Sequence, residues 1–289
     1  MKKMIGLLMV TLLAALTFSA STAFASDFNS AKDIAVVSRE DGSGTRGAFI
    51  ELFGILQKND DGTQKDLTTK EAVIAKQTDV MMTNIAGDPY AIGYISLGSL
   101  NETIKAVQIE GIAATTENVK NGTYPIARPF NIATKGEPTG LAKDFMDFIL
   151  SAEGQEIVAS SYIAANESAP PYQATQPAGK IVVAGSSSVT PIMEKLKEAY
   201  LALNPNGAIE IQQSDSSAGL AAALAGTCDI AMASRELKES ELAALAPTQI
   251  ALDGIAIIVN QGNPVETLAK EQVKAIFTGE MLSWSEVVQ

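Results

Sequence analysis

Residues 38–46 read Ser-Arg-Glu-Asp-Gly-Ser-Gly-Thr-Arg, a polar, glycine-containing stretch between two more apolar segments. The apolar run 34–37 before it predicts a buried strand, and the apolar spacing of residues 47–53 predicts a helix. The stretch therefore leads from a strand into the first turn of a helix, where backbone N–H groups lack partners and carry partial positive charge. It is either an anion-binding loop or a surface turn with exposed charges, and both readings stay open at this point.

The residue types within this stretch suit an anion. Gly42 and Gly44 allow backbone amides to approach a ligand without a Cβ in the way. Ser43 and Thr45 supply hydroxyl donors, and Arg39 supplies a planar cation that matches a tetrahedral oxyanion.

The first 25 of the 289 residues have the pattern of a secretory signal. Lys2 and Lys3 precede an apolar run at 4–16, and Ala23-Phe24-Ala25 matches the small-x-small cleavage pattern. No Cys lies near the predicted cleavage site, so a lipid anchor is not expected. The sequence predicts an exported protein, periplasmic or secreted.

The charge balance excludes some classes of partner. Without Lys2 and Lys3 the chain has 19 basic and 33 acidic residues, which argues against binding to nucleic acid or anionic membranes. The net negative charge of the chain also opposes the binding of an anionic ligand, so an anion has to be held by local dipoles and a few cations. The only arginines are Arg39, Arg46, Arg128 and Arg235.

The chain contains no histidine. Ser-His-Asp and Cys-His catalysis and His-based metal sites are thereby excluded. We expect no enzymatic activity, no metal and no cofactor.

The pattern along the chain alternates strands and helices, which predicts parallel sheets in an α/β protein. A Pro-containing segment, 164–179, reads as a linker, and 58–69 reads as a polar loop. Helices are predicted at 69–85, 141–150, 151–160, 193–203, 220–224 and 265–277, and later strands at 91–95, 106–109, 130–134, 180–184, 208–212, 229–233 and 252–260.

Four loops rich in Ser, Gly or Arg follow predicted strands. Ligands of such sheets bind beyond the carboxyl ends of the strands. Together the four loops contain three of the four arginines, and they favour an oxyanion site: 38–46, 185–190, 214–219 and 234–235.

Five segments closely resemble the exported phosphate-binding proteins that serve the high-affinity phosphate ABC importer: 38–46, 91–98, 185–191, 216–219 and 229–236. The resemblance implies a type II periplasmic-binding-protein fold with two α/β lobes, two hinge crossovers and phosphate held between the lobes. It further implies a monomer that delivers inorganic phosphate to the membrane subunits of the importer.

The order of these segments differs from that of the family, in which the 185–191 type of loop comes near the N-terminus and residues like 276–286 lead into the 38–46 segment. We interpret the order as a circular permutation, with 164–179 joining the usual termini; a misassembled gene is the alternative. One lobe should then be split, 26–123 plus 254–289, and the other continuous, 124–253.

The resemblance also assigns roles to residues. Phosphate contacts are implied for Arg39, Ser43, Gly44, Thr45, Ser188, the Val189 amide and Ser216. Where well-known members carry an Asp that accepts the phosphate proton, this chain has Ser234 and Arg235. Asp41 is the remaining candidate for that role, or it holds Arg39 as an ion pair.

Other functions remain open beside phosphate uptake. The same loops could bind sulfate, molybdate or tungstate, or serve a sensor without a transport role. A phosphatase-like enzyme would need an activating base or metals, and the absence of histidine counts against it.

Overall fold

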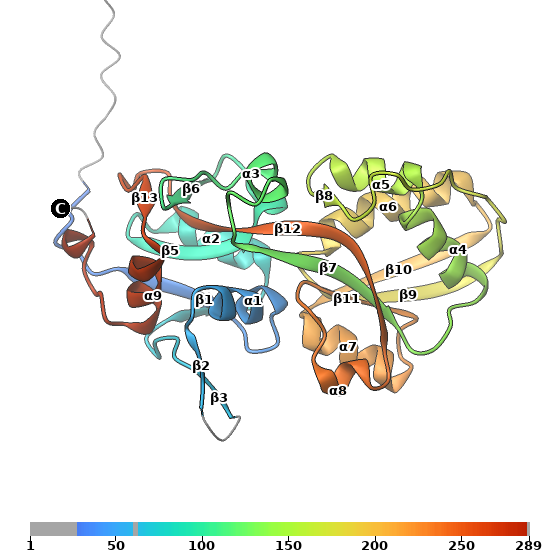
Figure 1. The fold of residues 1–289 in the computed structure, drawn as a ribbon, viewed down its shortest axis with the longest axis horizontal. Coiled ribbons are helices and arrows are strands. Elements are labelled where there is room, and N and C mark those ends of the chain that lie inside the picture. The colour runs from blue at the N-terminus through green and yellow to red at the C-terminus, as the bar shows by residue number, and fades with distance from the viewer. Residues whose placement is uncertain (1–27, 60–62, 288–289) are drawn as a thin grey trace, which may run out of the picture.

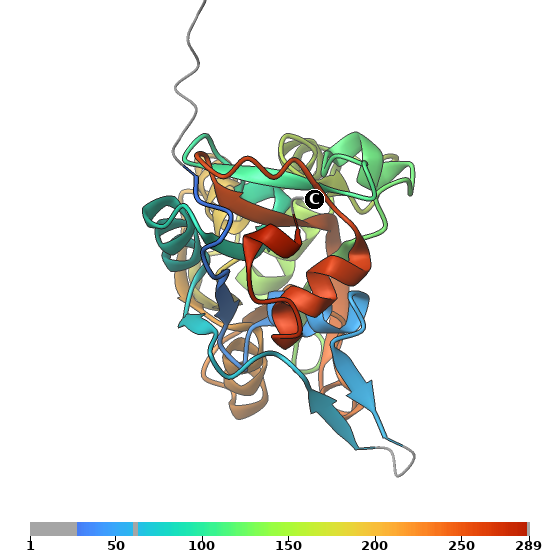
Figure 2. The same ribbon diagram turned by 90° about the vertical axis from the view of Figure 1, so that its left-hand side faces the viewer.

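A computed structural model describes residues 28–59 and 63–287 and shows two α/β lobes joined by two long strands (Figure 1). The signal predicted for residues 1–25 lies outside the described residues. The described chain begins and ends in the same lobe, here called the terminal lobe, which faces the viewer in Figure 2. The other is called the central lobe. Within the described residues, no helix is long and apolar enough to cross a membrane.

The terminal lobe has a parallel core in which β1 lies between β4 and β5. Its remaining strands and its helices surround that core. The elements are β1 (Ala35–Arg39), α1 (Gly44–Leu52), β2 (Leu56–Lys58), β3 (Gln64–Asp66), β4 (Val73–Ala75), α2 (Thr78–Gly87), β5 (Ala91–Ser96), η1 (Leu97–Ser99), β6 (Ile104–Ile109), α3 (Thr116–Lys120), β13 (Thr267–Leu268), α9 (Lys270–Thr278) and η2 (Trp284–Glu286).

The central lobe repeats this arrangement, with β9 parallel to β10 on one side and to β11 on the other. Its elements are α4 (Gly140–Ile149), α5 (Ala152–Ala159), β8 (Ile163–Ala164), β9 (Gly179–Ser186), α6 (Thr190–Leu203), β10 (Gly207–Ser214), α7 (Ser216–Ala225), β11 (Ile230–Ala233) and α8 (Glu239–Leu242).

Two antiparallel strands, β7 (Ala127–Thr134) and β12 (Ala246–Asn260), run from one lobe to the other. They make the sheet continuous in the order β10-β9-β11-β7-β12-β5-β1-β4. The sheet is therefore mixed, because β7 and β12 pair antiparallel with their neighbours while the lobe cores are parallel.

The prediction of a helix over 69–85 is wrong in its first half. Residues 73–75 form β4, which extends the sheet beside β1, and α2 begins only at Thr78. Pairing with a distant strand overrode the local pattern. For the same reason β3, in the predicted polar loop, pairs with β2, and β13 pairs with β6 ahead of α9.

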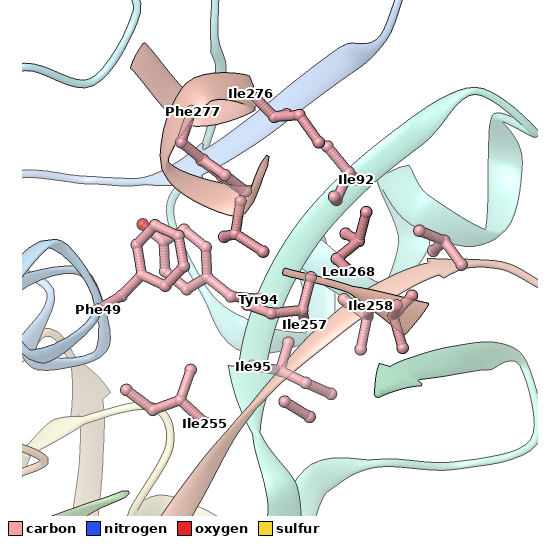
Figure 3. Packing of buried hydrophobic residues seen from close by; sticks show 14 of the residues in the cluster. Phe49, Ile92, Tyr94, Ile95, Ile255, Ile257, Ile258, Leu268, Ile276 and Phe277 are labelled. Atoms are coloured by element: carbon pink, nitrogen blue, oxygen red, sulfur yellow. The ribbon is translucent and has the colours of Figure 1, made fainter. Parts of the chain in front are cut away.

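Aromatic packing in the terminal lobe positions the first loop. Phe49 of α1 stacks on Tyr94 of β5 with ring centroids 3.9 Å apart, and Phe277 of α9 packs edge-on against Phe49 (Figure 3). The Tyr94 hydroxyl lies 2.9 Å from Ser38 Oγ and accepts a hydrogen bond from the Arg39 amide at 3.1 Å. Burial raises the pKa of Tyr94 to about 12, so the hydroxyl stays protonated. The core thus fixes the end of β1, where the predicted loop starts.

Residues 165–178 contain no helix or strand, as the linker prediction expects. The Asp144 carboxylate of α4 holds this segment, accepting hydrogen bonds from Tyr172 at 2.5 Å and from Thr175 at 2.5 Å. Tyr200 of α6 donates to the same carboxylate at 2.7 Å. Burial opposes the charge, but these hydrogen bonds together hold the pKa of Asp144 below its ordinary value.

Candidate anion-binding site

The first loop caps helix α1 and presents its N-terminus to the central lobe. Ser43 is the N-cap residue, and its Oγ accepts a hydrogen bond from the Arg46 amide at 3.3 Å. A Cβ added at Gly44 would lie 2.7 Å from Ser234 Oγ and closer still to Ser216 Oγ. Only glycine therefore allows the two lobes to approach this closely here.

Arg39, at the carboxyl end of β1, is only 1% exposed. Its Nε and Nη2 donate to both carboxylate oxygens of Glu40, at 2.8 and 2.7 Å. Nη2 also donates to Ser187 Oγ of the central lobe at 3.1 Å. The guanidinium is thus oriented by Glu40 on one side and faces the central lobe on the other.

Five serines of the central lobe gather opposite Arg39. Ser186 is the last residue of β9, and Ser187 and Ser188 follow it. Ser216 begins α7 after β10, and Ser234 follows β11, so three separate strand ends supply the serines. Ser186 Oγ donates to Ser234 Oγ at 2.9 Å, and the Ser234 amide donates to Ser216 Oγ at 3.1 Å.

Two threonines of the terminal lobe meet these serines. Thr45 Oγ1 lies 2.9 Å from Ser188 Oγ, and Thr78 Oγ1 lies 3.2 Å from Ser187 Oγ. We call these side chains the hydroxyl cluster; all are buried: Thr45, Thr78, Ser186, Ser187, Ser188, Ser216 and Ser234. The lobes are closed over it, and the Ser217 amide also donates to the Gly42 carbonyl at 3.2 Å.

Several residues expected at the site lie elsewhere. The Asp41 side chain is 95% exposed and pairs with Arg46, so the Asp41–Arg39 ion pair, one of the two roles considered for Asp41, is not formed; Arg39 pairs with Glu40 instead. Arg46 also pairs with Asp66 at 2.8 Å. The largely buried Arg46 thus pairs with both Asp41 and Asp66.

Arg235 and Val189 also differ from expectation. Arg235 donates to both carboxylate oxygens of Glu241, each at 2.8 Å, and to Ser217 Oγ at 3.1 Å, and neither partner belongs to the hydroxyl cluster. The Val189 amide, expected as an anion donor, donates to the Ser186 carbonyl at 3.0 Å. Ser188 and Ser216, by contrast, lie within the cluster as placed by the sequence.

A second buried ion pair lies behind the cluster. Arg128 of β7 and Asp253 of β12 are register partners, and Arg128 Nη2 lies 3.2 Å from Asp253 Oδ2. Arg128 Nη1 donates to the Ser234 carbonyl at 3.0 Å, so this pair connects both crossover strands to the last loop of the cluster. Burial raises the pKa of Asp253 to about 6 even though Arg128 lowers it.

Sequence reasoning missed Glu40, Thr78, Ser186 and Ser187 as side chains at the site. Glu40 lies inside the 38–46 loop, and Ser186 and Ser187 lie inside the 185–190 loop. The sequence therefore located these loops but did not distinguish these residues from their neighbours. Thr78 was hidden inside the overlong predicted helix 69–85. A threonine at the start of a helix can be recognised in a sequence, but only when the start of the helix is predicted correctly, here at residue 78.

The arrangement consists of neutral hydroxyls and one buried cation that faces them. This donor set can hold a dehydrated oxyanion, since hydroxyls and guanidinium groups donate hydrogen bonds to anionic oxygens. Among residues 28–59 and 63–287, no group of His, Cys, Asp or Glu side chains is arranged to hold a metal ion.

Comparison with known proteins agrees with this architecture. The PBP superfamily domain matches residues 18–153 and 170–289. The phosphate-binding protein PstS 2 of Streptococcus agalactiae is 50% identical over 99% of this chain and 98% of its own length. The phosphate-binding protein PstS 2 of Streptococcus pneumoniae is 43% identical over 88% of this chain and 87% of its own length.

A solved structure shows the same fold. The crystal structure of a phosphate ABC transporter, phosphate-binding protein from Streptococcus pneumoniae is 42% identical and superimposes with a TM-score of 0.70. The match covers 88% of this chain and 99% of that chain. By sequence and by fold, this chain belongs to the PBP superfamily and, within it, to the PstS group.

Proposed function

We propose that this chain is a solute-binding protein, not an enzyme, that captures inorganic phosphate between its lobes and delivers it to an ABC importer. The observation that carries the proposal is the buried hydroxyl cluster facing Arg39 across the two lobes. The PstS group supports phosphate as the ligand and the importer as the partner, since its relatives bear those names.

The residues proposed to contact phosphate come from the first loop and from three serines of the central lobe. Arg39 supplies the cation, Ser43, Gly44 and Thr45 lie at the N-terminus of α1, and Ser188, Ser216 and Ser234 come from the central lobe. Lobe closure over the anion removes it from water and brings the two sets of donors together.

The test is calorimetric titration of the exported protein with inorganic phosphate. Arg39→Ala should remove most binding while the circular dichroism stays unchanged, and Arg39→Lys should recover part of it because the charge remains. Lys180→Gln, on the exposed start of β9, is the control and should bind like wild type. Wild-type affinity in Arg39→Ala would refute the site, and absence of binding in the wild-type protein would refute the function.

A second candidate, an oxyanion such as sulfate, molybdate or tungstate, is favoured by one observation. Both oxygens of Glu40 already accept hydrogen bonds from Arg39, and the Asp41 side chain is exposed to solvent, so the first loop holds no carboxylate that is reserved for a phosphate proton. A free buried carboxylate would have rejected sulfate strongly. Competition between phosphate and sulfate decides; Asp41→Asn should leave their affinity ratio unchanged.

We also propose the circular permutation and the lobe boundaries that follow from it. The near-complete match to the Streptococcus agalactiae protein supports a natural segment order over a misassembled gene. The Ile34 amide donates to the Leu282 carbonyl at 2.7 Å, which supports a former junction between the present ends. The permutation also predicts that residue 289 lies close to the strand that starts at Ile34, but residue 289 is outside the described residues. The buried hydrophobic residues form one core from 34–126 together with 255–284, and further clusters within 130–251. This grouping supports a split lobe, 26–123 plus 254–289, and a continuous lobe, 124–253.

Export through the 1–25 signal and a monomeric state complete the proposal. Native mass spectrometry of the exported protein should give the mass of one chain without residues 1–25. A phosphate sensor without a transport role would be indicated by normal growth of a deletion strain on limiting phosphate.

A further inference from the structure

Thr78 lies among the central-lobe serines although it belongs to the terminal lobe and to none of the four predicted loops. It is the first residue of α2 and is 5% exposed. Its Oγ1 lies 3.2 Å from Ser187 Oγ, 3.4 Å from Ser188 Oγ and 3.4 Å from Arg39 Nη1. The hydroxyl therefore sits where the cation and the serines meet.

All three contacts of the Thr78 hydroxyl are long. A threonine hydroxyl has a single proton to donate, and O–H···O bonds in proteins are ordinarily about 2.7–2.8 Å. The Thr45–Ser188 and Ser186–Ser234 contacts, both 2.9 Å, are tighter. The proton of Thr78 is thus loosely held by its neighbours and is available to a ligand.

The backbone around Thr78 adds further donors. Helix α2 has ten residues, and its N-cap residue Gln77 makes no side-chain capping bond. In α1 and α7, by contrast, Ser43 and Asp215 each accept a first-turn amide. The first turn of α2 therefore presents amides and the positive end of the helix dipole without a capping side chain of its own.

We propose that Thr78 and the first turn of α2 bind the anion directly, as a third group of terminal-lobe donors beside Arg39 and the 43–45 turn. This inference rests on the proposed function of the site. A buried tetrahedral oxyanion needs donors on every oxygen. Arg39 Nε and Nη2 both donate to Glu40, which leaves fewer N–H groups of Arg39 for the anion. The anion oxygens that Arg39 does not reach therefore require neutral donors.

The location of Thr78 also makes its contribution depend on lobe closure. Its serine neighbours belong to the central lobe, so the full set of donors around it exists only in the closed form. Thr78 is thereby suited to stabilise the closed, anion-bound state more than the open one.

The test compares three variants by calorimetric titration with inorganic phosphate. Thr78→Val keeps the shape and removes the hydroxyl, Thr78→Ser restores it, and Thr83→Val removes an exposed hydroxyl from the same helix. We expect Thr78→Val to weaken phosphate binding at least tenfold, Thr78→Ser to remain within about threefold of wild type, and Thr83→Val to match wild type.

The outcomes are distinct. Wild-type affinity in Thr78→Val, or equal losses in Thr78→Val and Thr78→Ser, would overturn the inference and leave the proposed function in place. Loss of affinity in Thr83→Val equal to that in Thr78→Val would trace the effect to the helix rather than the hydroxyl and would also overturn it. A wild-type protein that binds no phosphate would refute the function and this inference together.

Discussion

Gly44→Ala should prevent full closure of the lobes while leaving each lobe folded. The added Cβ would lie 2.7 Å from Ser234 Oγ and 3.1 Å from Ser216 Cβ, and closer still to Ser216 Oγ. Rotation of the Ser216 side chain cannot remove this overlap, because its Cβ is also too near and its Oγ accepts the Ser234 amide. The first loop therefore has to retreat from the central lobe by about 1 Å to reach ordinary van der Waals contact.

A retreat of this size breaks the contacts that depend on closure. The Thr45–Ser188 hydroxyl pair, now 2.9 Å apart, would open beyond hydrogen-bond distance. An anion held by the central lobe would lose about two hydrogen bonds from the first loop, each worth about 1.5–3 kcal/mol to a charged group. The loss of about 3 kcal/mol corresponds to a Kd about 100-fold weaker.

The assay pairs calorimetric titration with thermal unfolding in the absence of phosphate. Alanine is a better helix former than glycine by up to about 1 kcal/mol, so Gly44→Ala should not unfold earlier than wild type. Gly47→Ala is the matched control in the same helix, because its Cβ would lie 3.5 Å from Arg235 Cδ, an ordinary contact. Wild-type affinity in Gly44→Ala, or an equal loss in Gly47→Ala, would refute the reasoning.

Three further substitutions test the structure around the site. Burial raises the pKa of Asp253 to about 6 in the folded protein, above its ordinary value, so folding is favoured when this carboxyl is protonated. That contribution to the free energy of unfolding is complete at low pH and is lost as the pH rises to about 6. Chemical denaturation should show the stability of wild type falling by about 3 kcal/mol relative to Asp253→Asn between pH 4 and 7; a constant difference would contradict this. Asp144→Asn should cost about 3 kcal/mol at pH 7, measured in the same way, because three hydroxyls lose a charged acceptor; an unchanged midpoint would show that these bonds add no stability. Tyr94→Phe should lower stability by about 1 kcal/mol and weaken phosphate binding modestly, because the Arg39 amide loses its partner; calorimetry with unchanged stability and affinity would exclude that support.

Local patterns predicted most of the strand–loop–helix units at the site. The strand before Ser38 and the helix after it are both present, because alternating apolar spacing and glycine-containing turns act over a few residues. The errors occurred where a strand pairs with a distant partner, as β4 does with β1, since no neighbouring residue carries that information. The missed helix start at Thr78 follows from this error.

The choice of ion-pair partners was less predictable. Arg39 pairs with Glu40 rather than Asp41, although both carboxylates follow it directly in the chain. Successive residues at a strand end point in different directions, so a difference of one position decides which carboxylate faces the buried guanidinium.

The sequence by itself determined the chemistry available to this protein: no histidine, few arginines, and hydroxyl-rich loops that follow strands and suit an oxyanion. Residue type and local spacing are sufficient for this, because donor groups and helix starts are properties of short segments. Only the tertiary structure decided which of these groups face one another. It buries Arg39 against Ser187, which lies 148 positions downstream, pairs Arg235 with Glu241 and Asp41 with Arg46, and adds Thr78. The physical reason is that burial and lobe closure select contacts by position in space, which the separation of residues along the chain does not encode.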